Sequence, residues 1–269
     1  MSRTRAGLYG LAAVALVWRV VVLANPGASP LLGDEPTRGD LNLLVARSLM
    51  GLVYLACGAL ILVKTRNRRS ALFALSAICA AIHWGGPVAI GDNQLQLAIW
   101  LVYFTVSVML TESAFLHFTL VFPEPWSWGP RHATRFVSYL PVVLGMVAAF
   151  MVLATAPDPV SDGWQGKFFI LETLQSNLFA LAGLVVLAIR CFRARPADGP
   201  RSITGPMAVA AWAAVLPWTA VMSLASRAVA VPRGSDVYTL FFVITPLVFT
   251  WAILRYEPVS ELEDAEVER

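Results

Sequence analysis

Ionisable residues stand within apolar segments at several points of this chain, and they are the first candidates for chemistry. Glu112 and His117 lie in the run LTESAFLHFTLVF. A carboxylate and an imidazole can act as a general acid and a general base. However, five residues turn a helix by about 140°, so these two side chains do not share one helix face. The spacing therefore weakens a metal site or a proton relay built from Glu112 and His117 alone.

A second polar group, LETLQSN, contains Glu172, Gln175 and Asn177. Glu172 lies near the start of its apolar segment, where a carboxylate can reach the membrane interface. Polar side chains of this kind more often form hydrogen bonds between neighbouring helices than carry out chemistry. We therefore expect this group to contribute to helix packing and keep Glu172 and Asn177 as intramembrane polar candidates.

Two arginines, Arg19 and Arg47, also fall inside apolar segments. The long side chain of an arginine near a helix end commonly extends to the membrane surface. Alternatively, both arginines face the interior of a helix bundle and pair with Asp34, Glu35 or Asp40 in the segment between them. In that case these residues form a pocket for an anionic or polar ligand.

The composition indicates a membrane protein. The 269 residues are 58% hydrophobic and 14% charged, whereas soluble domains average about 45–50% and about 25%. A soluble core of this composition would leave too few polar residues to cover its surface. The net charge of +3 gives no indication of nucleic-acid binding. Because Cys57, Cys79 and Cys191 have no metal-ligand spacing, we expect reduced thiols, no metal site and no cofactor.

Eight segments are long and apolar enough to cross a membrane as helices. They cover residues 6–24, 42–63, 71–90, 95–122, 136–154, 169–190, 203–223 and 237–254. Turn-forming or charged residues fill the gaps between them. The sequence therefore predicts an all-α, polytopic membrane bundle over residues 1–256 and a short acidic cytoplasmic tail over residues 257–269.

Lysine and arginine indicate the orientation. Fourteen of them lie at the N-terminus, in the second, fourth and sixth loops and at the C-terminus, whereas the other loops hold four. Positively charged loops stay on the cytoplasmic side, so we expect both termini in the cytoplasm. The alternative is a signal peptide cleaved after Val22–Ala24. Cleavage would leave seven spans and an N-terminus outside the cell.

Motifs of several enzyme classes are absent. The chain has no GxSxG nucleophile elbow, no HExxH zinc motif and no P-loop. Both lysines lie outside the spans, which disfavours a retinal Schiff base. We therefore expect a protein that is not an enzyme. One alternative is a small membrane enzyme or carrier for a lipid-like substrate, with Glu112 and His117 as catalytic candidates, and another is a structural subunit of a membrane complex.

The stretch LHFTLVFPEP, from Leu116 to Pro125, ends the fourth span. Proline stops a helix and disfavours helical geometry in the residue before it, so Pro123 should end this helix at Phe122. His117 lies about one and a half turns before this break. We expect its ring to form a hydrogen bond with another helix.

This stretch resembles the LHF-x-LxFP signature of the multi-span input region of bacterial sensor histidine kinases, in the group that includes the competence-pheromone receptor kinase. GLVYLACGALILVKTRNRRSALFAL (Gly51–Leu75) is similar to the family's second span, basic turn and third span. WAILRYEPVS (Trp251–Ser260) is similar to its last span and exit. The three motifs occur in the family's order, and the resemblance covers about residues 42–260.

The resemblance implies a bacterial inner-membrane sensor of a two-component system, which binds a membrane-soluble or periplasmic cue or a membrane partner and relays a helix shift. The chain departs from the family after the last span, because it has no histidine beyond His132 and no ATP-binding motif. Glu257 also replaces the family's usual basic residue. This chain alone is therefore no kinase. The expected partners are the lipid bilayer, a separately encoded kinase or other membrane protein, or a second copy of the chain.

Overall fold

The computed structural model describes residues 3–24, 38–65, 67–85, 101, 103, 105–123, 131–155, 164–193, 201–226 and 242–267. All elements within these residues are helices. They are α1 (Arg3–Ala24), α2 (Arg38–Lys64), α3 (Arg68–Gly85), α5 (Leu110–Val121), α6 (Arg131–Thr155), α7 (Trp164–Arg193), α8 (Arg201–Ser226) and α9 (Ile244–Val267). A π-helical segment, η2 (Thr105–Met109), directly precedes α5.

The all-α prediction is confirmed for the described part of the chain, and each of the eight expected segments overlaps one of these helices or, for the fourth, η2 and α5. Within the described residues, three stretches are long and apolar enough to cross a membrane, namely Leu44–Lys64, His132–Ala154 and Leu174–Arg193. Shorter apolar stretches lie in α5, α8 and α9. The last helix passes residue 254 and continues to Val267, into the acidic segment.

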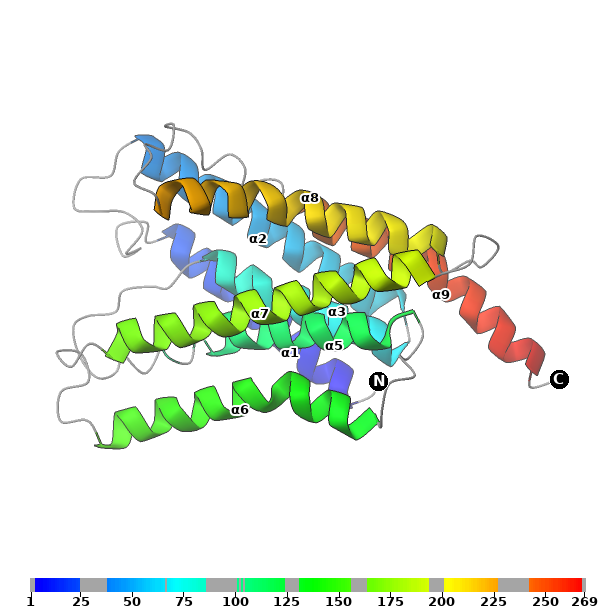
Figure 1. Ribbon diagram of the computed structural model, residues 1–269, viewed down its shortest axis with the longest axis horizontal. Coiled ribbons are helices and arrows are strands. Elements are labelled where there is room, and N and C mark those ends of the chain that lie inside the picture. The colour runs from blue at the N-terminus through cyan, green and yellow to red at the C-terminus, as the bar shows by residue number, and fades with distance from the viewer. Residues whose placement is uncertain are drawn as a thin grey trace.

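The helices run side by side along the long axis of the molecule (Figure 1), with α3 contacting α1, α2 and α5. The side chains of α3 are mostly small where they are buried, as at Ala74, Ala77 and Ala81. Small residues let helix backbones approach closely, which is the main source of packing between helices in lipid. The sequence of α3 therefore suits a position at the centre of the bundle.

The outward face of α6 carries large apolar side chains, whereas its buried face carries smaller ones, including Ser138, Ala149 and Val152. Phe136 and Phe150 are 64% and 70% exposed, whereas Ser138 is fully buried. Within the described elements, α6 contacts α5 and η2. Large exposed apolar side chains are unfavourable in water but suit the hydrocarbon of a bilayer. The outward face of α6 is therefore consistent with a helix that crosses a membrane.

Two glycines allow close approach to the fourth span. A methyl group on Gly183 of α7 would lie 2.6 Å from Cε1 of Phe115, and one on Gly145 of α6 would lie 2.6 Å from Sδ of Met109. Each glycine thus accepts a bulky side chain of the fourth span against its backbone. These two contacts set the positions of α6 and α7 beside η2 and α5.

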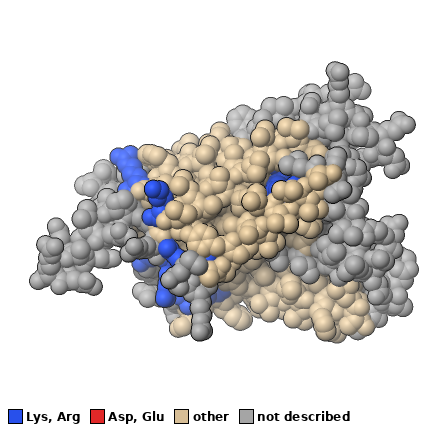
Figure 2. All heavy atoms as spheres, turned by 180° about the vertical axis from the view of Figure 1, so that it is seen from behind, with Lys and Arg blue, Asp and Glu red and all other residues tan. Residues whose placement is uncertain are grey.

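Positive charge gathers at one end of the bundle, as the blue surface in Figure 2 shows. We call this end the basic end. Arg5, Arg69 and Arg190 lie there, because they bind the carbonyl oxygens of Thr65, Pro123 and Leu120. Lys64, Arg68 and Arg193 lie at the adjacent helix ends. The start of α1 lies at the same end, and α9 projects from it beyond the other helices (Figure 1). The first and last helices therefore share the basic end.

Candidate functional site

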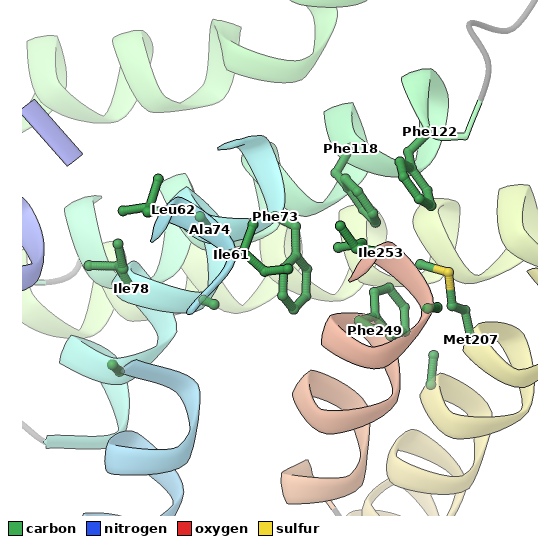
Figure 3. Close-up of a cluster of buried hydrophobic side chains, with 14 of the residues drawn as sticks. Ile61, Leu62, Phe73, Ala74, Ile78, Phe118, Phe122, Met207, Phe249 and Ile253 are labelled. Atoms are coloured by element: carbon green, nitrogen blue, oxygen red, sulfur yellow. The ribbon is translucent and has the colours of Figure 1, made fainter. Parts of the chain in front are cut away.

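An aromatic cluster joins α3, α5 and α9 near the basic end. We call it the aromatic junction; its members are Phe73 of α3, Phe115, Phe118 and Phe122 at the α5 end, and Phe249 and Tyr256 of α9. In Figure 3, Phe118 and Phe122 point toward α9, and Phe73 faces Phe249. Phe118 and Phe249 are fully buried. The last helix is thus fixed to the bundle interior through aromatic side chains.

The ring distances show direct packing. Phe118 and Phe122 stack at 4.8 Å between centroids, and Phe73 and Phe249 stack at 5.6 Å. Phe122 and Tyr256 meet edge to face at 5.5 Å. Aromatic pairs of this kind contribute about 0.5–1.5 kcal/mol each beyond their buried area. A movement of α9 therefore has to repack several rings together.

The end of α5 is held by arginines of two other helices. Phe122 has φ −109° and ψ 142°, so the helix ends there, as Pro123 predicts. Arg190 of α7 donates a 2.8 Å hydrogen bond to the carbonyl oxygen of Leu120, and Arg69 of α3 donates one of 2.5 Å to that of Pro123. Cations favour the carbonyl end of a helix. These bonds fix the α5 end relative to α3 and α7.

Segments that are far apart in the sequence meet at this place. The motif LHFTLVFPEP supplies Phe118 and Phe122, the segment Gly51–Leu75 supplies Phe73, and the segment Trp251–Ser260 supplies Tyr256. The sequence reasoning identified all three segments but did not predict that their aromatic residues touch. The spacing of Phe115, Phe118 and Phe122, at intervals of three and four residues, is the signal that could have indicated one apolar helix face.

Arg19 lies in the interior of the opposite half of the bundle. Its side chain is 1% exposed, and its Nη2 atom donates a 2.8 Å hydrogen bond to the carbonyl oxygen of Ala81 in α3. Its Nε and Nη1 atoms have no hydrogen-bond partner among the described residues. Arg19 therefore faces the bundle rather than extending along it to the membrane surface.

The neighbours of Arg19 come from several helices. A side chain on Gly51 of α2 would overlap the guanidinium group. Trp18 stacks on Tyr103 at 6.0 Å, and the Tyr103 hydroxyl donates a 2.7 Å hydrogen bond to the carbonyl oxygen of His83. Arg47 stands one turn before Gly51 in α2 and is half-buried. Sequence reasoning named Arg19 and Arg47 but missed Gly51, which no pattern in the sequence singles out.

The expected carboxylate partners lie outside the described residues. Asp34 and Glu35 fall in the segment between α1 and α2 that the structure does not describe, and for Asp40 only the backbone is described. The predicted pairing of these acids with the two arginines therefore stays a prediction.

The side chain of His117 contacts the neighbouring helix α6. Its Nδ1 atom and the Tyr139 hydroxyl of α6 are joined by a 3.2 Å hydrogen bond, and the two rings meet edge to face at 5.5 Å. The expected hydrogen bond to another helix is thus confirmed. Glu112 is half-buried in the same helix, within electrostatic range of Tyr54 in α2. The described residues contain no group of three His, Cys, Asp or Glu side chains that could hold a metal ion.

The polar group in α7 packs against the π-helical segment. Gln175 donates a 3.4 Å hydrogen bond to the carbonyl oxygen of Met109, the last residue of η2. This contact agrees with the expected role of the group in joining helices. Asn177 is exposed, and the side chain of Glu172 lies outside the described part of the structure.

The chain was compared with protein families, with curated proteins and with solved structures. No family model matches it. No curated protein and no solved structure matches it either. The described residues form a helical bundle with three helices long and apolar enough to cross a membrane, an aromatic junction at its basic end and a buried arginine in its other half.

Proposed function

We propose that this chain is the input module of a membrane sensor, which relays a helix shift to α9. The aromatic junction is the observation that carries the proposal. It connects the last helix to α3 and α5 through buried rings, and α9 alone projects from the basic end among the described helices. Its segments are also those that resemble the input regions of sensor histidine kinases.

In the proposed orientation, the bundle crosses the bacterial inner membrane with its basic end in the cytoplasm. Positively charged ends of membrane bundles stay on that side. The start of α1 and the end of α9 then both lie in the cytoplasm. The Arg19 region lies in the outer half of the membrane, where it can receive a membrane-soluble or periplasmic cue.

The proposed relay is a change between two packings of the bundle. A cue shifts the balance only when it binds one packing more tightly than the other. Because interdigitated rings have discrete arrangements, the aromatic junction favours a step of α9 over a gradual drift. The η2 segment precedes α5 in the same span, and π-helical turns often occur at functional positions. A change near Arg19 would reach α5 through this segment and through α3.

The partner in this proposal is a separately encoded kinase that receives the movement of α9. Its detection requires the full chain, purified through an N-terminal tag from native membranes in mild detergent, with mass spectrometry of the retained proteins and small molecules. We expect a protein with dimerisation and ATP-binding domains. A variant with Glu261→Gln, Glu263→Gln and Asp264→Asn should lose it, because these residues lie in the projecting part of α9.

The opposite results would contradict the split-sensor proposal. Retention of the same proteins by the neutralised variant would show that α9 does not select them. A lipid-like molecule that is retained alone and altered during incubation would indicate an enzyme or carrier. Glu112 and His117 would then be the first residues to substitute.

A further inference from the structure

Arg19 is a buried cation in α1, although other faces of the same helix are exposed. Its neighbours Val17 and Val20 are 62% and 60% exposed, whereas Arg19 is 1% exposed. The helix thus turns its valines outward and its charge inward. A buried charge without a counter-charge is unfavourable, and such residues inside membranes commonly mark a functional site. The position of Arg19 therefore requires a source of negative charge.

The described residues supply only part of that charge. The carbonyl oxygen of Ala81 accepts a hydrogen bond from Nη2 near the end of α3, and a helix C-terminus carries roughly half an elementary negative charge. Glu112 is the one acidic side chain that the structure describes, and no ion pair joins it to Arg19. Nε and Nη1 of Arg19 have no hydrogen-bond partner within the described residues. Among the described residues, no negatively charged side chain is thus paired with Arg19.

The surrounding groups fit an anion rather than a second cation or an apolar ligand. Arg47 and Gly51 are four residues apart in α2 and therefore lie on one helix face. Gly51 receives the Arg19 guanidinium against its backbone, so Arg47 lies one turn from the same group. Arg47 is half-buried and brings a second positive charge to this face of α2. His83 lies within electrostatic range of both arginines.

We propose that Arg19 and Arg47 bind an oxyanion, either the acidic headgroup of a lipid or a small soluble phosphate or carboxylate. Guanidinium groups form strong charge-assisted hydrogen bonds with such oxygens. The Nε and Nη1 atoms of Arg19 can both donate hydrogen bonds to the oxyanion. Because Gly51 has no side chain, the guanidinium group of Arg19 fits against α2. The inference deepens the proposed sensor function, because the oxyanion is then its cue or part of it. Binding itself does not depend on any movement of α9.

Thermal unfolding of the full chain in an uncharged detergent tests the site. The additions are phosphatidylglycerol, phosphatidylcholine and inorganic phosphate, each tested alone. A higher Tm with phosphatidylglycerol than with phosphatidylcholine identifies a lipid headgroup as the oxyanion, whereas an equal rise with phosphate identifies a soluble one. If neither anion raises the Tm above its value with phosphatidylcholine, the proposal is overturned.

Matched variants assign the effect to Arg19. Arg19→Gln should lose the rise in Tm that the anion causes, whereas Arg193→Gln, an exposed arginine at the basic end, should keep it. Gly51→Ala displaces the guanidinium and should also lose the rise, whereas Gly10→Ala places its methyl group in open space and should keep it. Retention of the rise by Arg19→Gln would overturn the proposal.

The variant without added anion gives an independent test. Because Arg19→Gln removes an uncompensated buried charge, its Tm in phosphatidylcholine should equal or exceed that of the unmodified chain. A lower Tm that Asp34→Asn or Glu35→Gln also produces would show that a carboxylate of this chain already compensates Arg19, and the oxyanion site would be overturned. An anion-dependent Tm together with an immobile α9 would leave the site intact and refute the relay instead.

Discussion

At the scale of single residues, the phenylalanines of this chain divide into two groups with different roles. Phe118 and Phe249 are fully buried in the aromatic junction, whereas Phe150 is 70% and Phe192 is 85% exposed. Lipid replaces the contacts of an exposed ring but cannot enter the space of a buried one. The position of a phenylalanine, not its presence, therefore decides its contribution to stability.

Substitution of the two groups should separate these contributions. Phe118→Ala and Phe249→Ala should each lower the free energy of unfolding by an amount near the lower end of the about 3–5 kcal/mol found for aromatic core residues, because a cavity remains. Phe150→Ala should change it by about 0.5 kcal/mol or less. Reversible unfolding in mixed micelles measures both. Equal losses for Phe118→Ala and Phe150→Ala would show that the junction does not stabilise the bundle.

Among single residues, the sequence indicated some of the important side chains but not others. It selected Arg19, because a charge inside an apolar segment is visible in any sequence. It predicted the hydrogen bond of His117 to another helix, but not Tyr139 as the partner, because the partner depends on how α6 packs. It passed over Gly51, whose importance follows from the Arg19 guanidinium packed against its backbone.

At the scale of elements, the fourth span is held by side chains of both α3 and α7. Its described part includes η2, which accepts a hydrogen bond from Gln175, and it ends at Phe122, where Arg69 and Arg190 hold the last carbonyl groups. Proline at position 123 predicted the end of the helix. The arginines that hold it could not be predicted, since they come from segments about 50 and 70 residues away in the sequence and meet only in the folded bundle.

Removal of one arginine should loosen this end. Arg190→Gln should lower the free energy of unfolding by about 1.5–3 kcal/mol, the usual range for a hydrogen bond to a charged group. Arg193→Gln, on the same helix but exposed, should have little effect. Hydrogen exchange of the Leu120 and Val121 amides should also speed up in Arg190→Gln only. Unchanged exchange there would show that Arg190 does not hold the end of α5.

At the scale of the whole molecule, the positions of the helices along the chain are the feature that sequence reasoning predicted best. Span positions depend on long apolar runs, which are local, and the structure contains a helix in each of them. The arrangement of the helices depends on contacts between distant segments, so the central position of α3 and the outer position of α6 were not predictable in this way.

The proposed orientation leads to a labelling prediction. Single cysteines are introduced into a chain without its native cysteines. Lys64→Cys and Arg193→Cys lie at the basic end, whereas Ala24→Cys and Ala154→Cys lie at the opposite end of the bundle. All four positions are exposed. A membrane-impermeant maleimide should label Ala24→Cys and Ala154→Cys in cells with an intact inner membrane. The other two should react only after permeabilisation. The reverse pattern would invert the orientation.

Movement of α9 tests the account most directly. Spin labels at Lys64→Cys and Arg255→Cys, both exposed positions, report the distance between α2 and α9 by pulsed electron resonance. We predict two distances whose populations shift between phosphatidylcholine nanodiscs and nanodiscs with a native membrane extract. Phe249→Ala should abolish the shift, and Leu247→Ala, 52% exposed on the same helix, should preserve it. One distance that is the same in both lipids and all variants would contradict a relay through the aromatic junction.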